Sequence, residues 1–227
     1  MDAQGGFTML DKKTNELFYT TGEEIFNAVT HGIGSVLAIA GTGALLALSD
    51  RHTWLICLVY GLSLVLLYTM STLYHSFSGP NLKHIFRVFD HASIFLLIAG
   101  SYTPFTLILL RGTVKGPVIC GIVWAAAILG VILNAISVKR FEKLSMLLYV
   151  AMGWAVVFAI GDVVRALPPA GFWLLLLGGI SYTAGIIFYA WHKKFHTHYI
   201  HGVWHLFVLA GSVLHFICVF LYVLPMA

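Results

Sequence analysis

Two histidines four residues apart, in the stretch His201-Gly-Val-Trp-His205, have a spacing that suits metal chemistry. On an α-helix, residues i and i+4 lie on one face, about 6 Å apart along the axis, so both imidazoles could bind one ion. The spacing alone is weak evidence, because eleven histidines in 227 residues produce such pairs by chance, and His192 and His196 form another. The pair predicts a metal site only if other segments bring further ligands to the same depth.

The composition indicates the environment of these histidines. Apolar residues make up 59% of the chain and charged residues 10%, whereas soluble domains carry about 25% charged residues. Apolar runs of about 20 residues, the length of a membrane-spanning helix, follow one another along the chain. The pattern predicts an all-α integral membrane protein. The formal net charge is +4. In a membrane protein, such an excess of basic residues usually marks the cytoplasmic loops, so it does not indicate a nucleic-acid partner.

Seven apolar runs are predicted to form a bundle of seven transmembrane helices. They span residues 28–47, 54–74, 92–110, 117–137, 144–164, 172–191 and 203–224. The chain is therefore predicted to consist of a short polar N-terminal segment, residues 1–26, and one transmembrane domain, residues 27–227. A break or kink is expected within Gly100-Ser-Tyr-Thr-Pro104, where proline interrupts the third run.

The basic residues outside the runs predict the orientation. Seven spans divide them into nine on the side of the N-terminus and four on the other side, which accounts for all 13. Since the side richer in Lys and Arg is normally cytoplasmic, the N-terminus is predicted inside and the C-terminus outside. We therefore expect a multi-pass protein of the cell inner (plasma) membrane, with His201 and His205 near the cytoplasmic leaflet.

Three other predicted helices carry polar residues at this inner depth. Ionisable side chains are costly within a membrane, so each is a candidate for a functional site. The candidates are Ser71 and His75 at the end of the second helix, Asp90 and His91 at the start of the third, and Glu24, Asn27 and His31 in a stripe at the start of the first.

His75, His201 and His205 are predicted to bind zinc. Three neutral imidazoles leave a fourth position open for water, the arrangement of catalytic zinc. Asp90 could be a further ligand, orient a ligand or accept a proton. Ser71 could be a nucleophile, could position water or substrate, or could be a small residue that eases helix packing. Its place one turn deeper than His75 favours the positioning role.

The remaining polar candidates are expected around the same cavity or outside it. Glu24 and Asn27 are predicted to line the cavity; His31 and His91 could line it or cap helix ends. His192, His196 and His198 lie beside two lysines and are predicted in a solvated cytoplasmic loop. His215 lies ten residues beyond His205, about 15 Å along a helix, and is predicted to be a hydrogen-bonded packing residue.

Four motifs occur in order along the chain: Glu24-x-x-Asn27-x-x-x-His31, Ser71-x-x-x-His75, Asp90 followed by Ser-Tyr-Thr-Pro-Phe, and His201-x-x-x-His205. A chain with these motifs resembles the bacterial haemolysin III proteins, in the superfamily of progestin and adipoQ receptors that includes adiponectin receptors. The resemblance implies a seven-helix bundle with a cytoplasmic N-terminus. It also implies an intramembrane zinc site at His75, His201 and His205, with Asp90 holding a water at the metal.

Two classes of function follow from the site and the resemblance. Animal relatives are associated with hydrolysis of the lipid amide ceramide, so the first hypothesis is a zinc-dependent hydrolase of a membrane lipid amide or ester, with Asp90 and Ser71 as catalytic residues. The alternative is a non-enzymatic membrane sensor or homeostasis protein, or a pore-forming haemolysin, with a structural zinc. Pore formation is less favoured because no amphipathic insertion segment is evident. The short N-terminal segment, predicted to lie inside, argues against hormone reception.

Overall fold

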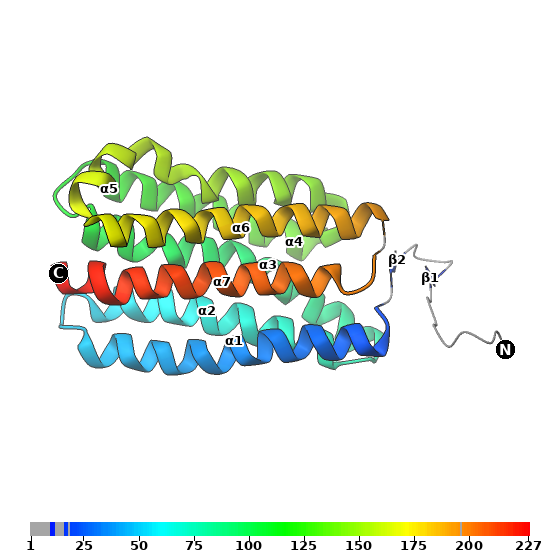
Figure 1. Cartoon of the computed structure of the whole chain (residues 1–227). Helices are drawn as coiled ribbons and strands as arrows, with labels where there is room; N and C mark the ends of the chain where they lie inside the picture. Colours follow the sequence, from blue (N-terminus) through cyan, green and yellow to red (C-terminus); the bar gives the residue numbers. More distant parts are fainter. Residues whose placement is uncertain (1–9, 12–15, 18, 196) are drawn as a thin grey trace.

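The computed structural model describes residues 10–11, 16–17, 19–195 and 197–227. Within this part, six helical stretches are long and apolar enough to cross a membrane. The elements are α1 (Thr21–Leu48), α2 (Trp54–Ser76), α3 (Pro80–Pro104), η1 (Phe105–Leu109), α4 (Lys115–Gly153), η2 (Ala155–Ala159), α5 (Ile160–Ala166), α6 (Pro169–Phe195), α7 (Ile200–Cys218), η3 (Val219–Val223) and η4 (Leu224–Met226). A two-residue pair, β1 (Leu10–Asp11) with antiparallel β2 (Glu16–Leu17), precedes them. Apart from this pair the described chain is all-helical, as predicted (Figure 1).

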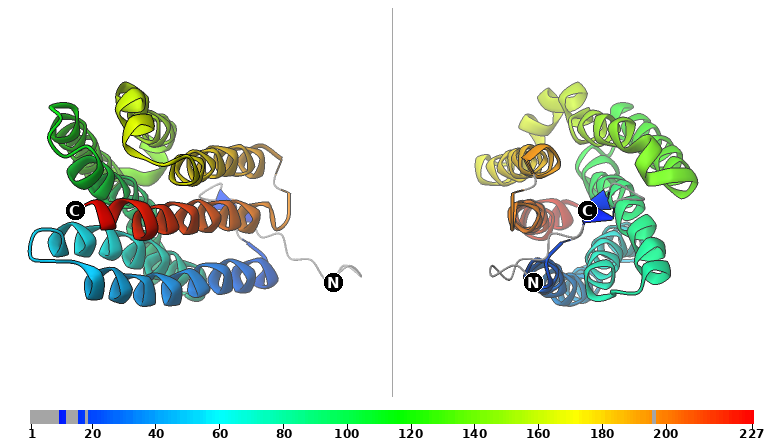
Figure 2. Two further views of the ribbon diagram at one scale, coloured as in Figure 1. Left: turned by 60° about the vertical axis from the view of Figure 1, so that its left-hand side comes forward. Right: turned by 90° about the vertical axis from the view of Figure 1, so that its right-hand side faces the viewer.

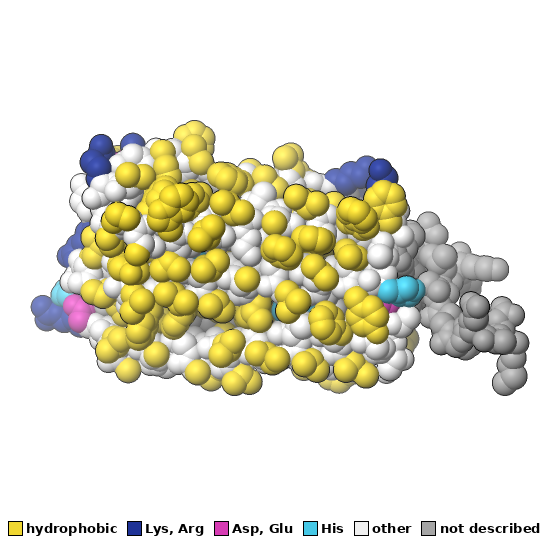
Figure 3. All heavy atoms as spheres, viewed as in Figure 1, with side chains coloured by type: hydrophobic (Ala, Val, Ile, Leu, Met, Phe, Trp, Pro, Cys, Tyr) yellow, Lys and Arg dark blue, Asp and Glu magenta, His cyan; other side chains and the backbone are white. Residues whose placement is uncertain are grey.

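Hydrophobic side chains cover the flank of the bundle. In Figure 3 they extend over its whole length, and Lys and Arg side chains gather at the two ends. Many large apolar residues of the bundle are well exposed, for example Val36 at 68% and Phe158 at 79%. Such a continuous apolar surface is compatible with lipid and incompatible with water. The protein is therefore a multi-pass membrane protein.

The helix starts follow from local sequence. Thr20 caps α1: its hydroxyl accepts from the Glu23 backbone N–H, and the Glu23 carboxylate accepts from the Thr20 N–H in return. This reciprocal capping box begins α1 at Thr21, inside the segment that was predicted to be polar N-terminal chain. Pro80 stands at the first position of α3, where its missing N–H costs no helical hydrogen bond.

The segment from Lys115 to Ala166 differs from the sequence prediction. A turn was predicted at residues 138–143, between the fourth and fifth runs, but these residues are helical. The break lies instead at Ser137, whose extended backbone (φ −169°, ψ 108°) joins two helices within α4. Figures 1 and 2 show the chain turning back along this stretch. Charged residues such as Lys139 and Glu142 are compatible with helix, so their presence did not mark a loop.

The break predicted near Pro104 is present. The α-helical geometry of α3 ends at Pro104, and the chain continues as the π-helix η1. Threonine hydroxyls donate to nearby carbonyls: Thr103 to Ala99 (2.9 Å) and Thr106 to Tyr102 (2.8 Å). Such bonds are the usual way to satisfy a proline-disturbed helix inside a membrane.

The packing order brings distant helices to one place. Helix α1 contacts both α2 and α7, and α7 also contacts α6. Close approaches are made at glycines, since a Cβ at Gly34 would lie 2.6 Å from the Tyr68 ring and one at Gly41 would lie 2.8 Å from the Phe216 ring. Gly34 and Gly41 therefore serve close packing of α1 against its neighbours. The result places the end of α2 and the start of α7 around the start of α1 (Figure 1).

Replacing Gly130 by alanine is expected to destabilise the bundle. A Cβ there would lie 2.3 Å from the ring of Phe95, which is completely buried. Forcing an extra methyl into a packed core typically costs about 1–3 kcal/mol. Gly121→Ala in the same helix is the matched control, because its Cβ would meet nothing within 4 Å. Thermal unfolding of the detergent-solubilised variants measures the effect; equal midpoints would contradict the packing.

Candidate metal centre

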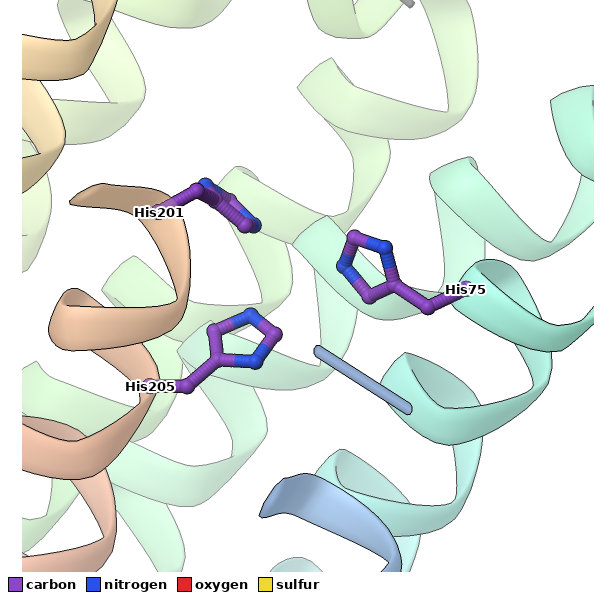
Figure 4. A group of neighbouring side chains, drawn as sticks. All are labelled: His75, His201 and His205. Carbon is purple, nitrogen blue, oxygen red and sulfur yellow. The ribbon is translucent and has the colours of Figure 1, made fainter. Parts of the chain in front are cut away.

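Three histidines from two helices converge inside the bundle. His75 lies near the end of α2, and His201 and His205 lie on successive turns at the start of α7 (Figure 4). One ring nitrogen from each lies within 4.8 Å of the others. The residues are 3%, 4% and 0% exposed, respectively. The sequence-predicted ligands are thus brought together in a buried group that could hold a metal ion.

His75 is oriented by a carboxylate. Its Nδ1 lies 2.6 Å from Glu24 Oε2, while the other oxygen of Glu24 accepts from Lys83 Nζ at 2.6 Å. A carboxylate accepts, so Nδ1 of a neutral His75 carries the proton and its Nε2 presents a lone pair. A carboxylate behind a ligating histidine is the arrangement that commonly fixes such ligands at metal sites.

His205 is oriented by a hydroxyl that the sequence did not indicate. Its Nδ1 lies 3.4 Å from Thr30 Oγ1, and that hydroxyl already donates to the Asn27 carbonyl at 2.9 Å. The Thr30 oxygen is therefore left to accept from Nδ1–H of His205, which directs the Nε2 lone pair to the centre. Thr30 was missed because its position on α1 is visible only once α1 and α7 are packed together.

The histidine nitrogens that face the centre fit a metal. Nε2 of His75, Nε2 of His205 and both ring nitrogens of His201 have no hydrogen-bond partner among the described residues. An unsatisfied buried polar atom costs about 1–3 kcal/mol. Three neutral imidazoles with lone pairs in one place form a donor set typical of catalytic zinc. The arrangement is therefore compatible with zinc.

Asp90 and Ser71 are buried beside each other. Asp90 is 4% exposed and lines the large cavity described below. The Ser71 hydroxyl lies near this carboxylate and has no hydrogen-bond partner among the described residues. Asp90 does not belong to the group of three whose ligand atoms lie within 4.8 Å of one another.

The other four predicted cavity residues have different surroundings. Glu24 holds His75, as described above. Asn27 is 1% exposed, and its side-chain amide has no hydrogen-bond partner in the described chain. His31 stacks on His205, with ring centroids 3.6 Å apart and an interplanar angle of 12°. His91 donates from Nδ1 to the Arg87 carbonyl at 3.0 Å and lines a small separate cavity with Glu142 and Tyr189. The structure thus brings His31 to the centre and leaves His91 beside it.

One histidine was wrongly assigned to a solvated loop. His192 lies within α6, is buried, and places its ring 5.6 Å from that of His201, with Nδ1 bonded to the Thr197 carbonyl. The helix α6 extends four residues beyond the predicted run, which carries His192 inward. His198 is well exposed but lies 3.2 Å from Glu23 Oε2, a carboxylate the sequence did not place there. His196 lies outside the described residues.

Tyr19, which lies just before the N-terminus of α1, covers the centre. Its ring lies 4.9 Å from that of His201 and 5.4 Å from those of His75 and His192. Burial, together with the neighbouring tyrosines and Glu24, raises the pKa of Tyr19 well above its usual value, so its hydroxyl stays neutral. No motif in the sequence singled out this residue.

An apolar cavity of about 200 Å³ leads away from the centre. His31 and Asp90 line it, and its lining continues along α3 to Phe105 at the start of η1, 15 residues or about 22 Å beyond Asp90. Apolar residues of η2 and α6, including Val157 and Leu176, form much of the remaining wall. His215 also lines it and bonds through Nε2 to the Leu175 carbonyl at 3.0 Å, as expected of a packing histidine.

Replacing Glu24 by glutamine is expected to weaken zinc binding about 10- to 100-fold, the usual cost of losing an outer partner of a ligand. Glutamine keeps the size of the side chain but removes the charge that holds His75 Nδ1–H. Competition with a chromophoric chelator measures the affinity. Asp162→Asn, which removes a carboxylate paired with Lys115 and Arg165, is the control. An unchanged affinity in Glu24→Gln would contradict the orienting role.

Comparison with known proteins assigns the chain to a family. The profile of the family described as Haemolysin-III related matches residues 19–216. The chain is 44% identical over 222 residues to Hemolysin-3 of Bacillus cereus, covering 96% of this chain and 100% of that protein. It is 44% identical to the Hemolysin-3 homolog of Bacillus subtilis (strain 168) over 209 residues, 90% of this chain and 96% of that protein. It is also 26% identical over 213 residues to the human Monocyte to macrophage differentiation factor, covering 89% and 85% of the two chains.

Proposed function

The chain belongs to the haemolysin III-related family, within the progestin and adipoQ receptor superfamily, and from this premise we propose that it is a zinc-dependent hydrolase of a membrane lipid amide or ester. The observation that carries the proposal is the junction of two features. A buried set of three imidazoles stands beside His31, and His31 lines the same long apolar cavity as Asp90. The substrate class is thus a lipid with a long chain and a carbonyl, as in ceramide.

We place this centre near the cytoplasmic leaflet of the cell inner membrane. As a single helix, the 52 residues from Lys115 to Ala166 would be about 78 Å long, against a hydrocarbon core of about 30 Å. The break at Ser137 supports two spans in this stretch, and hence seven crossings with the termini on opposite sides. The excess of basic residues on the side of the N-terminus supports a cytoplasmic location of that end.

Each residue of the centre has a distinct task in this mechanism. His75, His201 and His205 would hold zinc, with Glu24 and Thr30 fixing the tautomers of two of them. When bound, zinc would polarise the lipid carbonyl and lower the pKa of water. Asp90 would accept the proton of the attacking water and return it to the leaving amine or alcohol. Ser71, beside Asp90, would help to place water or substrate.

The cavity supplies binding and exclusion of water. Its apolar wall would hold the acyl chain along α3 and so bring the carbonyl to the end marked by Asp90. Apolar burial favours this pose at about 25 cal/mol per Å². The chain in the cavity would also keep bulk water from the centre, which strengthens the electrostatic interactions there.

Lipid turnover by purified protein tests the proposal. Zinc-loaded wild type in lipid nanodiscs is incubated with ceramides and with acyl esters, and released fatty acid is measured by mass spectrometry. We expect fatty acid from at least one substrate class, and none from the chelator-treated protein or from His75→Ala. Zinc-loaded protein that releases no fatty acid from either class would refute the hydrolase and favour a structural zinc in a non-enzymatic membrane protein.

A further inference from the structure

The three histidines of the centre are not oriented in the same way. His75 has Glu24 and His205 has Thr30 as hydrogen-bond partners. Neither ring nitrogen of His201 has a partner in the described part of the chain. Ligating histidines normally depend on such a partner to fix the ring. The orientation of His201 must therefore come from its backbone and from the side chains packed on its ring.

The backbone just before His201 has an unusual conformation. Tyr199 has φ 60° and ψ −6°, and among the described residues it is the one non-glycine residue with positive φ. Residues other than glycine, asparagine and aspartate rarely adopt this left-handed region, so surrounding contacts must hold Tyr199 in this conformation. The Tyr199 carbonyl accepts from Val203 N–H at 3.0 Å, which forms the first turn of α7 around His201.

Glu23 is the residue that holds Tyr199. Its side chain is buried at the start of α1, and its Oε1 accepts from the Tyr199 N–H at 2.9 Å. Its Oε2 accepts from His198 Nδ1 at 3.2 Å and from both the N–H and the hydroxyl of Thr20, at 2.9 Å and 2.8 Å. One carboxylate thus joins the start of α1 to the loop before α7.

The bonds to Thr20 also bear on His201 from the opposite side. Thr20 follows Tyr19, whose ring packs on that of His201 at 4.9 Å. Fixing Thr20 therefore helps to fix the aromatic cover as well. Helix capping alone accounts for the bonds between Glu23 and Thr20, but it does not account for the bond to Tyr199, which is 176 residues away in sequence.

We propose that Glu23 is a positioning residue of the metal centre: through Tyr199 and Thr20 it sets the first turn of α7 and the orientation of His201. This inference rests on the proposed zinc centre. It assigns to Glu23, a residue outside the four sequence motifs, the task that Glu24 performs for His75. The two adjacent acidic residues thus serve two different ligands, one by contact with the ring and the other through the backbone.

Glu23→Gln in the full-length protein tests the inference. The carboxamide keeps the side-chain size but offers one acceptor oxygen where the carboxylate offers two. We expect about tenfold weaker zinc binding, in the range for outer partners of a ligand, and an altered visible spectrum of the cobalt-substituted protein. Asp162→Asn, at a carboxylate paired with Lys115 and Arg165, is the control and should keep the wild-type spectrum. Adding Tyr199→Gly to Glu23→Gln should restore part of the affinity, because glycine adopts positive φ without strain.

The outcomes separate this inference from the proposed function. If wild type binds zinc and His75→Ala does not, an unchanged affinity and cobalt spectrum in Glu23→Gln would overturn the role of Glu23. If wild type and His75→Ala bind equally little zinc, the metal centre itself fails. Hydrogen–deuterium exchange of the amides of residues 200–205 then decides about Glu23: faster exchange in Glu23→Gln supports its hold on α7, and unchanged exchange overturns it.

Discussion

His205→Ala is expected to abolish stoichiometric zinc binding. His205 is completely buried, its Nε2 has no partner in the described chain, and its removal leaves two of the three imidazoles. The loss should exceed the roughly 10- to 100-fold effect of removing an outer partner, because no other His, Cys, Asp or Glu of the described residues joins this group of ligand atoms. Elemental analysis of the purified protein, followed by zinc titration against a chelator, measures the loss.

His215→Ala is the matched control for this prediction. It removes a second histidine from the same helix, one that lines the cavity and bonds to the Leu175 carbonyl. Both variants should lose some stability, because each truncates a histidine that packs inside the bundle. Only His205→Ala should lose the metal. Zinc retained at full stoichiometry by His205→Ala, or lost equally from both variants, would refute the ligand assignment.

The membrane fold was predictable because lipid leaves the backbone few options. Every peptide group in the hydrocarbon region must be bonded within the chain, so long apolar runs become helices. Runs such as 54–74 and 172–191 accordingly lie within α2 and α6. The turn predicted at 138–143 was wrong, because charged residues are compatible with a helix. No proline marks the break at Ser137, so the sequence did not indicate its position.

The centre was predictable to the extent that it follows from periodicity and depth. The i,i+4 spacing placed His201 and His205 on one face, and counting spans placed His75 at the same depth; the structure brings all three together. Their role as ligands and the inner-leaflet location stay predictions. Thr30, Tyr19 and Glu23 could not be identified beforehand, because each acts through a contact with a helix or loop that is distant in sequence.

Asp90→Asn is expected to remove lipid hydrolysis while leaving zinc in place. The asparagine side chain has nearly the same size, so the buried position between Ser71 and the cavity stays filled, but it cannot accept a proton. Loss of a general base typically lowers the rate by about 10²–10⁴-fold. The measurement is kcat/KM for fatty-acid release, made beside a zinc titration of the same sample.

The pairing of these two measurements gives the variant its discriminating value. Ser71→Ala, which changes the neighbour of Asp90 but keeps the carboxylate, should reduce the rate less than Asp90→Asn does. Loss of zinc from Asp90→Asn would make Asp90 a ligand, which the separation of Asp90 from the three-histidine group argues against. Undiminished turnover with zinc retained would exclude Asp90 as the base. Catalysis would then depend on the zinc held by the three histidines. Only retained metal with lost turnover supports the division of labour proposed here, in which histidines hold the ion and the cavity carboxylate moves the proton.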